Sequence, residues 1–247
     1  MSRLVVASSL VALLALTAER DARADLRSFT QTYEYSTVPE GKTAIELWHT
    51  QGRTTWDKTS PQFYEQILEI EHGFTDHWDA AFYTVFSQVA GDATTSKAFG
   101  LEAVKLESRY RFADRGEWPV DTLVYVEVAK DFGASVYELE GKVIVARDFD
   151  KFTAAANAIG AVKVGNDTVE TELELGWAAG LTYQAHPKFK LGAETWGKLE
   201  ESELYLSAGP AVSLAPSSNI WVTLTAGFGV TDVAEAFSAR AIIGIEL

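Results

Sequence analysis

The sequence contains no cysteine and has no long uncharged apolar run beyond its first residues. The missing cysteines exclude a disulfide framework and a thiolate metal site. They also suit a chain exported into an oxidising periplasm, where stray thiols pair wrongly. No later apolar run approaches the roughly 20 residues that a transmembrane helix needs. A membrane location would therefore require a closed β-barrel, which satisfies its backbone hydrogen bonds internally.

Basic charge is also scarce, with 21 Lys and Arg against 35 Asp and Glu and a net charge of -14. A nucleic-acid partner would need a clustered basic face, so this composition excludes one. The sequence also lacks a nucleophile elbow, a zinc-protease motif, a phosphate loop and a dinucleotide fingerprint. We therefore predict a protein that is not an enzyme, with no catalytic residue and no cofactor.

The first residues have the pattern of an export signal. Arg3 gives a positive start, residues 4–18 are mostly apolar, and Ala22-Arg23-Ala24 supplies the small residues that a signal peptidase reads. The alternative is a retained anchor or a buried helix. The predicted organisation is a signal peptide at residues 1–24, an N-terminal lead-in or plug segment at residues 25–40, and a barrel at residues 41–247.

Residues 168–183 carry the clearest periodic signal in the chain. Val169, Thr171, Leu173 and every second residue to Tyr183 fall on one face, while three glutamates fall on the other. Strict alternation of this kind indicates a β-strand. Strands of soluble proteins usually have about 5–6 residues, so this one is long enough to cross a membrane at a tilt.

The same alternation recurs along the chain, and turn signals divide it at regular intervals. The phase slips near Ala103-Val104, which indicates a β-bulge. Counting from Gly41 predicts a transmembrane antiparallel up-and-down β-barrel of about 12 strands, with a polar, Glu-rich lumen. With both chain ends in the periplasm, the turns near 73–76, 114–116, 148–150, 186–188 and 216–218 would be periplasmic.

The rival fold is a soluble periplasmic sandwich or lipocalin-like barrel, which would place its apolar face inside. Alternation alone does not distinguish inside from outside. The membrane barrel is favoured because bulky residues lie on the apolar face, whereas small residues separate the charges on the polar face. Residues 237–247 also resemble the C-terminal strand by which outer-membrane assembly machinery recognises its substrates, with Leu247 in place of the usual Phe. We therefore predict a protein in the outer membrane of a Gram-negative bacterium, with membrane lipid and the assembly machinery as partners.

The candidate functional residues are the charged side chains predicted to face the lumen. They are Glu69, Glu71, Glu102, Lys105, Glu107, Arg109, Glu127, Glu138, Glu140, Glu170, Glu172, Glu174, Glu194 and Arg240. One interpretation is an open channel or uptake barrel whose acidic columns favour cations or another small solute. The other is a narrow barrel filled by Glu–Lys and Glu–Arg pairs, with a structural, adhesive or scaffold role.

The histidines and tryptophans give weaker signals. His72 and His77 lie near several carboxylates around one predicted turn, but polar turn residues are usually solvated, so we predict no metal site. Most tryptophans lie near predicted strand ends, which is typical of an interfacial belt. Trp196 and Trp221 are exceptions, because the alternation places them on the inward face.

Several short motifs resemble a family of poorly characterised bacterial outer-membrane barrels described as a "MetA pathway of phenol degradation" group. The matching motifs are Thr32 to Tyr35, Glu69 to Trp78 and Glu172 to Trp177. The resemblance implies a transport or surface role and transfers no catalytic residue.

Overall fold

The computed structural model describes residues 27–247 apart from 93, 135, 166–171 and 201. The predicted signal peptide lies outside the described residues. The chain forms strands β1 (Thr43–Arg53), β2 (Gln62–Thr75), β3 (Trp78–Ala90), β4 (Lys97–Arg111), β5 (Asp121–Asp131), β6 (Tyr137–Phe149), β7 (Phe152–Val164), β8 (Glu172–His186), β9 (Phe189–Glu200), β10 (Glu203–Ser217), β11 (Ile220–Gly229) and β12 (Phe237–Glu246). No helix among the described residues is long and apolar enough to cross a membrane.

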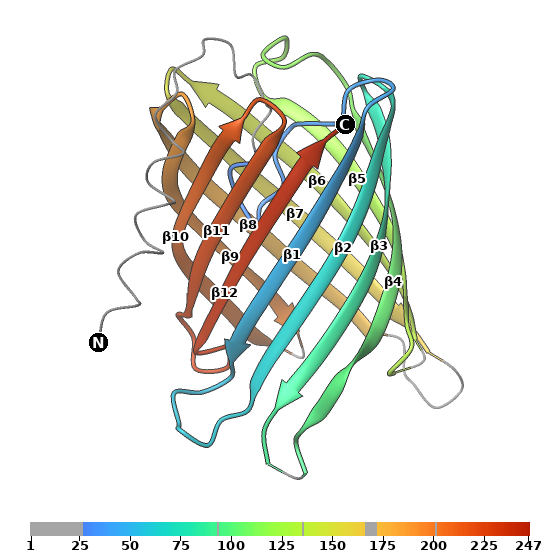
Figure 1. The fold of residues 1–247 in the computed structure, drawn as a ribbon, viewed down its shortest axis with the longest axis vertical. Helices are drawn as coiled ribbons and strands as arrows, with labels where there is room; N and C mark the ends of the chain where they lie inside the picture. The colour runs from blue at the N-terminus through green and yellow to red at the C-terminus, as the bar shows by residue number, and fades with distance from the viewer. Residues whose placement is uncertain (1–26, 93, 135, 166–171, 201) are drawn as a thin grey trace, which may run out of the picture.

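The twelve strands close into one antiparallel barrel (Figure 1). Each strand pairs with its neighbours in the chain, and β1 pairs with β12, where Leu47 lies opposite Ile243. Closure leaves no exposed sheet edge. The predicted fold class and strand number are confirmed, and the sandwich alternative is wrong.

The connections fall at two ends of the barrel. At the turn end, where β1 begins and β12 ends, they are residues 76–77, 112–120, 150–151, 187–188 and 218–219. The connections that follow β1, β3, β5, β7, β9 and β11 start from the opposite end, here called the loop end. A register shift between Leu101 and Ala103 puts the bulge at Glu102, one residue before its predicted place.

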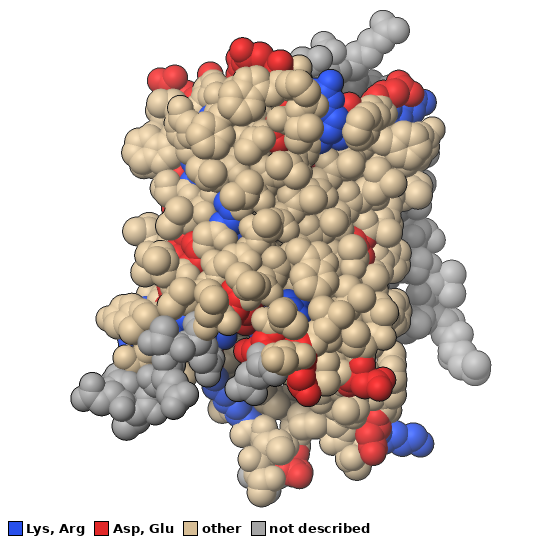
Figure 2. All heavy atoms as spheres, turned by 180° about the vertical axis from the view of Figure 1, so that it is seen from behind, with Lys and Arg blue, Asp and Glu red and all other residues tan. Residues whose placement is uncertain are grey.

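The barrel has apolar side chains outside and polar ones inside. Leu106 is 60% exposed and Leu173 66%, whereas Glu69 and Glu107 are each 1% exposed. A soluble barrel would reverse these faces. Figure 2 shows one side of the molecule, where most of the surface between the two ends carries no charge. The prediction that the apolar residues face outward is therefore confirmed.

Exposed aromatic rings border this apolar surface near both ends. At the turn end Phe74 stacks on Trp78, and Phe112 stacks on Trp118. At the loop end Phe86 stacks on Phe99. Aromatic girdles at two levels are typical of transmembrane barrels, in which the rings lie at the headgroup regions of the lipid.

Residues 27–40, here called the lumenal segment, lie inside the barrel (Figure 1, blue). Phe29 and Tyr35 are 0% and 1% exposed. They share a buried cluster with wall residues that include Leu123 and Ile144. The lumen is therefore occupied by the chain's own N-terminal residues.

Candidate functional site

The carboxylate of Glu194 on β9 holds the first part of the lumenal segment. It accepts hydrogen bonds from three consecutive backbone N–H groups, those of Thr30 (2.9 Å), Gln31 (2.8 Å) and Thr32 (2.9 Å). Thr225 on β11 donates its hydroxyl to the same carboxylate. Bonds to an ionised acceptor are roughly twice as strong as neutral ones, so Glu194 is the principal anchor of an irregular backbone.

A second wall residue, Asn157 on β7, forms hydrogen bonds with both backbone groups of Tyr33, as a neighbouring strand would. Its side-chain oxygen accepts from the Tyr33 N–H at 2.7 Å, and its amide donates to the Tyr33 carbonyl at 2.9 Å. Ser213 and Thr223 donate their hydroxyls to the Arg27 carbonyl. Wall side chains thus satisfy these buried backbone groups of the segment, as burial requires.

The later part of the segment is tied to the turn end. The Tyr35 hydroxyl bonds the backbone of Ala113, whose N–H donates to it at 3.0 Å. The Val38 N–H donates to the Asp79 carboxylate at 2.8 Å, and Thr37 donates to the Asp76 carbonyl. The segment is therefore fixed at its beginning, middle and end.

Two glycines of the wall make room for the segment. A Cβ at Gly180 on β8 would lie 2.4–2.8 Å from the ring of Phe29. A Cβ at Gly73 on β2 would lie 2.2 Å from the carbonyl oxygens of Val38 and Pro39. Real Cβ atoms do not approach other atoms so closely, so a larger residue at either position would displace the segment.

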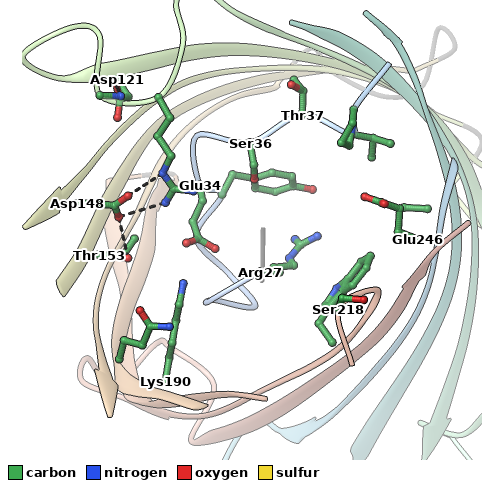
Figure 3. A pocket seen from close by; sticks show the side chains of 18 of the residues that line it. Arg27, Glu34, Ser36, Thr37, Asp121, Asp148, Thr153, Lys190, Ser218 and Glu246 are labelled. Atoms are coloured by element: carbon green, nitrogen blue, oxygen red, sulfur yellow. Dashed lines mark hydrogen bonds and ion pairs between the residues drawn. The ribbon is translucent and has the colours of Figure 1, made fainter. Parts of the chain in front are cut away.

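The segment separates two cavities inside the barrel. The turn-end cavity has a volume of about 860 Å³, and the loop-end cavity has about 430 Å³. Figure 3 looks into the turn-end cavity, where Arg27, Glu34 and Ser36 of the segment lie across the lumen while Asp148 and Lys190 lie on the wall. Tyr33 lines both cavities. It therefore lies at the division between them.

The turn-end cavity contains charges of both signs in nearly equal number. Its seven carboxylates are Glu34, Glu46, Glu71, Asp121, Asp148, Asp150 and Glu246, and its six basic groups are Arg27, Arg109, Arg115, Arg147, Lys151 and Lys190. Several of these opposite charges form ion pairs with each other. Arg115 contacts Asp148 at 2.7 Å (Figure 3), and Asp148 also accepts from Thr153.

In the loop-end cavity every basic side chain is paired with a carboxylate. The pairs are Lys105–Glu127 (3.0 Å), Lys142–Glu140 (2.9 Å), Lys198–Glu174 (2.9 Å) and Arg240–Glu65 (3.4 Å). Lys142 also lies over the rings of Tyr33 and Tyr125, 4.3 Å and 4.0 Å from their centroids. A polar solute in this cavity would therefore meet paired charges and aromatic faces.

A buried acidic cluster lies in the wall formed by β2, β3 and β4. Arg109 contacts Asp79 (2.7 Å), Glu107 (3.2 Å) and Glu71. Glu69 is 1% exposed, and its Oε2 atom has no hydrogen-bond partner among the described residues. Three carboxylates around one guanidinium leave an acidic excess in this part of the wall.

Most described residues of the predicted lumenal set belong either to the acidic cluster or to the loop-end cavity. Glu69, Glu71, Glu107 and Arg109 belong to the acidic cluster, while Lys105, Glu127, Glu140, Glu174 and Arg240 line the loop-end cavity. Glu194 binds the segment, Glu102 pairs with Lys97 near the loop end, and Glu138 is half-buried on β6. Glu170 lies outside the described residues. Glu172 lies on β8, and only its backbone position is described.

Several residues that build this site have no signal in the sequence. Arg27 and Tyr33 lie in a segment without periodicity, so no pattern indicated their contacts. Trp48 faces the lumen and is 6% exposed, although we predicted that most tryptophans lie in the interfacial belt. Its alternation with Leu47, which is 58% exposed, could have shown this. No group of three His, Asp or Glu side chains suited to a metal ion occurs in the part of the chain that the structure describes.

The geometry can be compared with that of known proteins. No protein-family model matches the sequence, and no curated protein matches it. A solved structure of an outer-membrane channel of the COG4313 group from Pseudomonas putida F1 superposes with a TM-score of 0.75 at 12% identity, covering 89% of this chain and 100% of that one. This chain has the fold of a Gram-negative outer-membrane β-barrel.

Two porins have similar barrels. The KdgM porin, solved in complex with disordered oligogalacturonate, superposes with a TM-score of 0.58 at 10% identity and covers 82% of this chain and 97% of its own. The NanC porin gives the same TM-score and identity, covering 83% of this chain and 100% of its own. At identities this low, the likeness establishes the outer-membrane barrel fold alone.

Proposed function

We propose that this barrel is an outer-membrane channel for small solutes, and that the lumenal segment is a plug that must move before the channel conducts. The observation that supports this proposal is the position of the segment between two cavities, one at each end of the barrel. A barrel filled for stability alone would not need a cavity of about 860 Å³ on one side of the segment. The similarity to outer-membrane channels and porins agrees with this function.

The proposed solute is small and polar, with a preference for cations. Carboxylates outnumber basic groups by one in each cavity. Rings and columns of carboxylates favour cations in narrow passages. Passage would be by diffusion, and the proposal assigns no catalytic residue and no cofactor.

The proposal also includes the surroundings of the barrel. Residues 1–24 would direct export and residues 25–40 would include the plug. The C-terminal strand β12 would be recognised by the outer-membrane assembly machinery. Membrane lipid would cover the apolar exterior.

A filled, non-conducting barrel with a structural, adhesive or scaffold role is the second candidate. The specific observation in its favour is the pairing of every basic side chain in the loop-end cavity. In that case the lumenal segment would be a permanent part of the core. The two candidates differ in whether loosening the segment changes ion flow.

The test is single-channel recording of protein purified from outer membranes, comparing the unaltered chain with Glu194→Gln. The substitution keeps the size and one acceptor oxygen but turns an amide NH₂ toward the other backbone donors, so the anchor is weakened. We expect more frequent or larger openings. Glu138→Gln on β6 is the matched control, because this residue lies on the same lumenal face away from the anchor. Absence of current in all three proteins would favour the filled barrel, whereas equal measurable currents would contradict a role for the Glu194 anchor in gating.

A further inference from the structure

The guanidinium of Arg27 occupies a built site on the barrel wall. It donates to the Glu46 carboxylate at 3.0 Å, and its central carbon lies 4.4 Å from the ring centroid of Trp48 and 4.9 Å from that of Tyr33. A cation that contacts both a carboxylate and aromatic faces is strongly favoured when water is excluded. Arg27 and Tyr33 belong to the segment, whereas Glu46 and Trp48 belong to β1.

The wall holds Glu46 in position independently of Arg27. The indole N–H of Trp48 donates to Glu46 at 2.7 Å, and that of Trp221 donates at 3.0 Å. Gly244 on β12 makes room for Trp221, because a Cβ there would lie 2.1 Å from its ring. Two indole donors on one buried carboxylate keep this site formed when the segment is absent.

A second carboxyl group lies on the acidic side of this site. Glu69 lies directly across from Glu46 in the β1–β2 pairing, and its Oε2 atom has no partner among the described residues. Two carboxylates opposite each other repel unless a cation or a shared proton compensates them. The Nη2 atom of Arg27 is likewise buried without a hydrogen-bond partner in the described structure. Arg27 therefore fits the site without satisfying all of its polar atoms.

We propose that Glu46, Trp48 and Glu69 form a binding site for the guanidinium or ammonium group of a cationic solute, which Arg27 occupies while the channel is closed. A solute cation and the plug would then compete for one position. This inference deepens the proposed function and rests on it for the role of the site in transport. Binding itself can be measured without any conductance.

The experiment uses the full chain purified from outer membranes with Arg27→Ala, which vacates the site. Methylguanidinium chloride is titrated at constant ionic strength, and binding is followed by calorimetry and by tryptophan fluorescence. We expect saturable binding to Arg27→Ala that is about tenfold or more weaker in Arg27→Ala/Glu46→Gln, because a hydrogen bond to a charged group is lost. The unaltered protein should bind more weakly than Arg27→Ala, since its own side chain competes.

Lys190→Ala is the matched control. Lys190 also contacts the segment, through the Ser28 hydroxyl at 2.8 Å, but it lies over no aromatic ring of the described residues. This variant should gain no methylguanidinium binding. Heat-modifiable migration on gels verifies that each barrel is folded. If the Glu46 variant does not fold, Arg27→Ala/Trp48→Leu provides the same comparison through loss of the ring face.

Equal binding by Arg27→Ala and its Glu46→Gln or Trp48→Leu derivative would overturn the proposal, as would no binding by Arg27→Ala. Either result would leave the recordings of Glu194→Gln unaffected. Conversely, absence of channel currents would refute the proposed function without altering the binding titration. The two proposals can therefore fail separately.

Discussion

The carboxylate of Glu194 accepts the backbone N–H of Thr30 at 2.9 Å, although 164 positions separate the two residues in the chain. This bond and its neighbours on Gln31 and Thr32 hold an irregular segment against a regular wall. The wall supplies side-chain acceptors where a strand would supply carbonyl groups. The segment is thus buried without joining the sheet, which is the structural basis for treating it as a plug.

Gly180→Ala tests the contact between wall and segment. The added Cβ would meet the Phe29 ring, so the ring has to move at a cost of about 1–3 kcal/mol in unfolding free energy. We expect lower stability in urea titrations and more channel opening. Gly160→Ala on β7 is the control, because no atom lies within 4 Å of its added Cβ. Identical behaviour of the two variants would show that Phe29 does not pack as described.

Leu181→Arg and Leu175→Arg test the placement of the barrel in lipid. Both side chains face outward, 51% and 52% exposed, but Leu181 lies nearer the middle of β8 (Glu172–His186). An arginine near the bilayer midplane costs about 2–4 kcal/mol, falling to about 0–1 near the interfaces. We therefore expect Leu181→Arg to lower unfolding free energy in lipid vesicles more than Leu175→Arg does. The reverse order, or no loss in either, would contradict the assigned faces.

Glu174→Gln tests the contribution of the loop-end cavity to selectivity. Glu174 contacts Lys198 at 2.9 Å and Lys163 at 3.6 Å, and all three side chains are partly exposed. Such pairs contribute at most about 1 kcal/mol, so the fold should persist. The reversal potential in a salt gradient should shift away from cations, because both lysines keep their charge. Glu203→Gln at the exposed start of β10 should leave the potential unchanged, and an equal shift there would rule out a local effect.

The titration of Asp92 tests the hydrogen bonding of the loop between β3 and β4, which lies outside the strands. Hydrogen bonds from the hydroxyls and backbone N–H groups of Thr94 and Thr95 lower the pKa of this carboxyl to about 2. Because the folded pKa is depressed, these bonds stabilise the loop above the ordinary pKa and are lost as pH falls toward about 2. The carboxyl carbon-13 shift in micelles should titrate with that midpoint. A midpoint near 4 would mean that the loop bonds are absent in solution.

Much of the barrel could be predicted from the sequence because alternation is a local property. Val169 to Tyr183 indicated a long strand, and the bulky outer face with small residues between the inner charges indicated the inverted arrangement. The same alternation placed Trp196 and Trp221 inside. Strand number followed from the regular turns, since each crossing of the membrane needs one strand.

The site could be predicted only in part, because it depends on contacts between distant residues. Alternation places Glu194 on the inner face, but it gives no sign that Thr30 binds there. Residues 27–40 have no periodic pattern. The contacts of Arg27 with Glu46 and Trp48, and those of Tyr33 with Asn157, therefore could not be predicted. The identity of ion-pair partners such as Lys198 and Glu174 also depends on register, which sequence patterns fix only loosely.

The most direct test of the plug is a reversible disulfide cross-link between the lumenal segment and the barrel wall. The chain has no cysteine, so Phe29→Cys/Gly180→Cys introduces a single possible cross-link where a Cβ at Gly180 would lie within 2.8 Å of the Phe29 ring. Single-channel currents are recorded from the same protein with the disulfide formed and then after reduction. We predict a closed channel when oxidised and openings after reduction. Currents that are the same in both states would contradict the claim that the lumenal segment gates the pore.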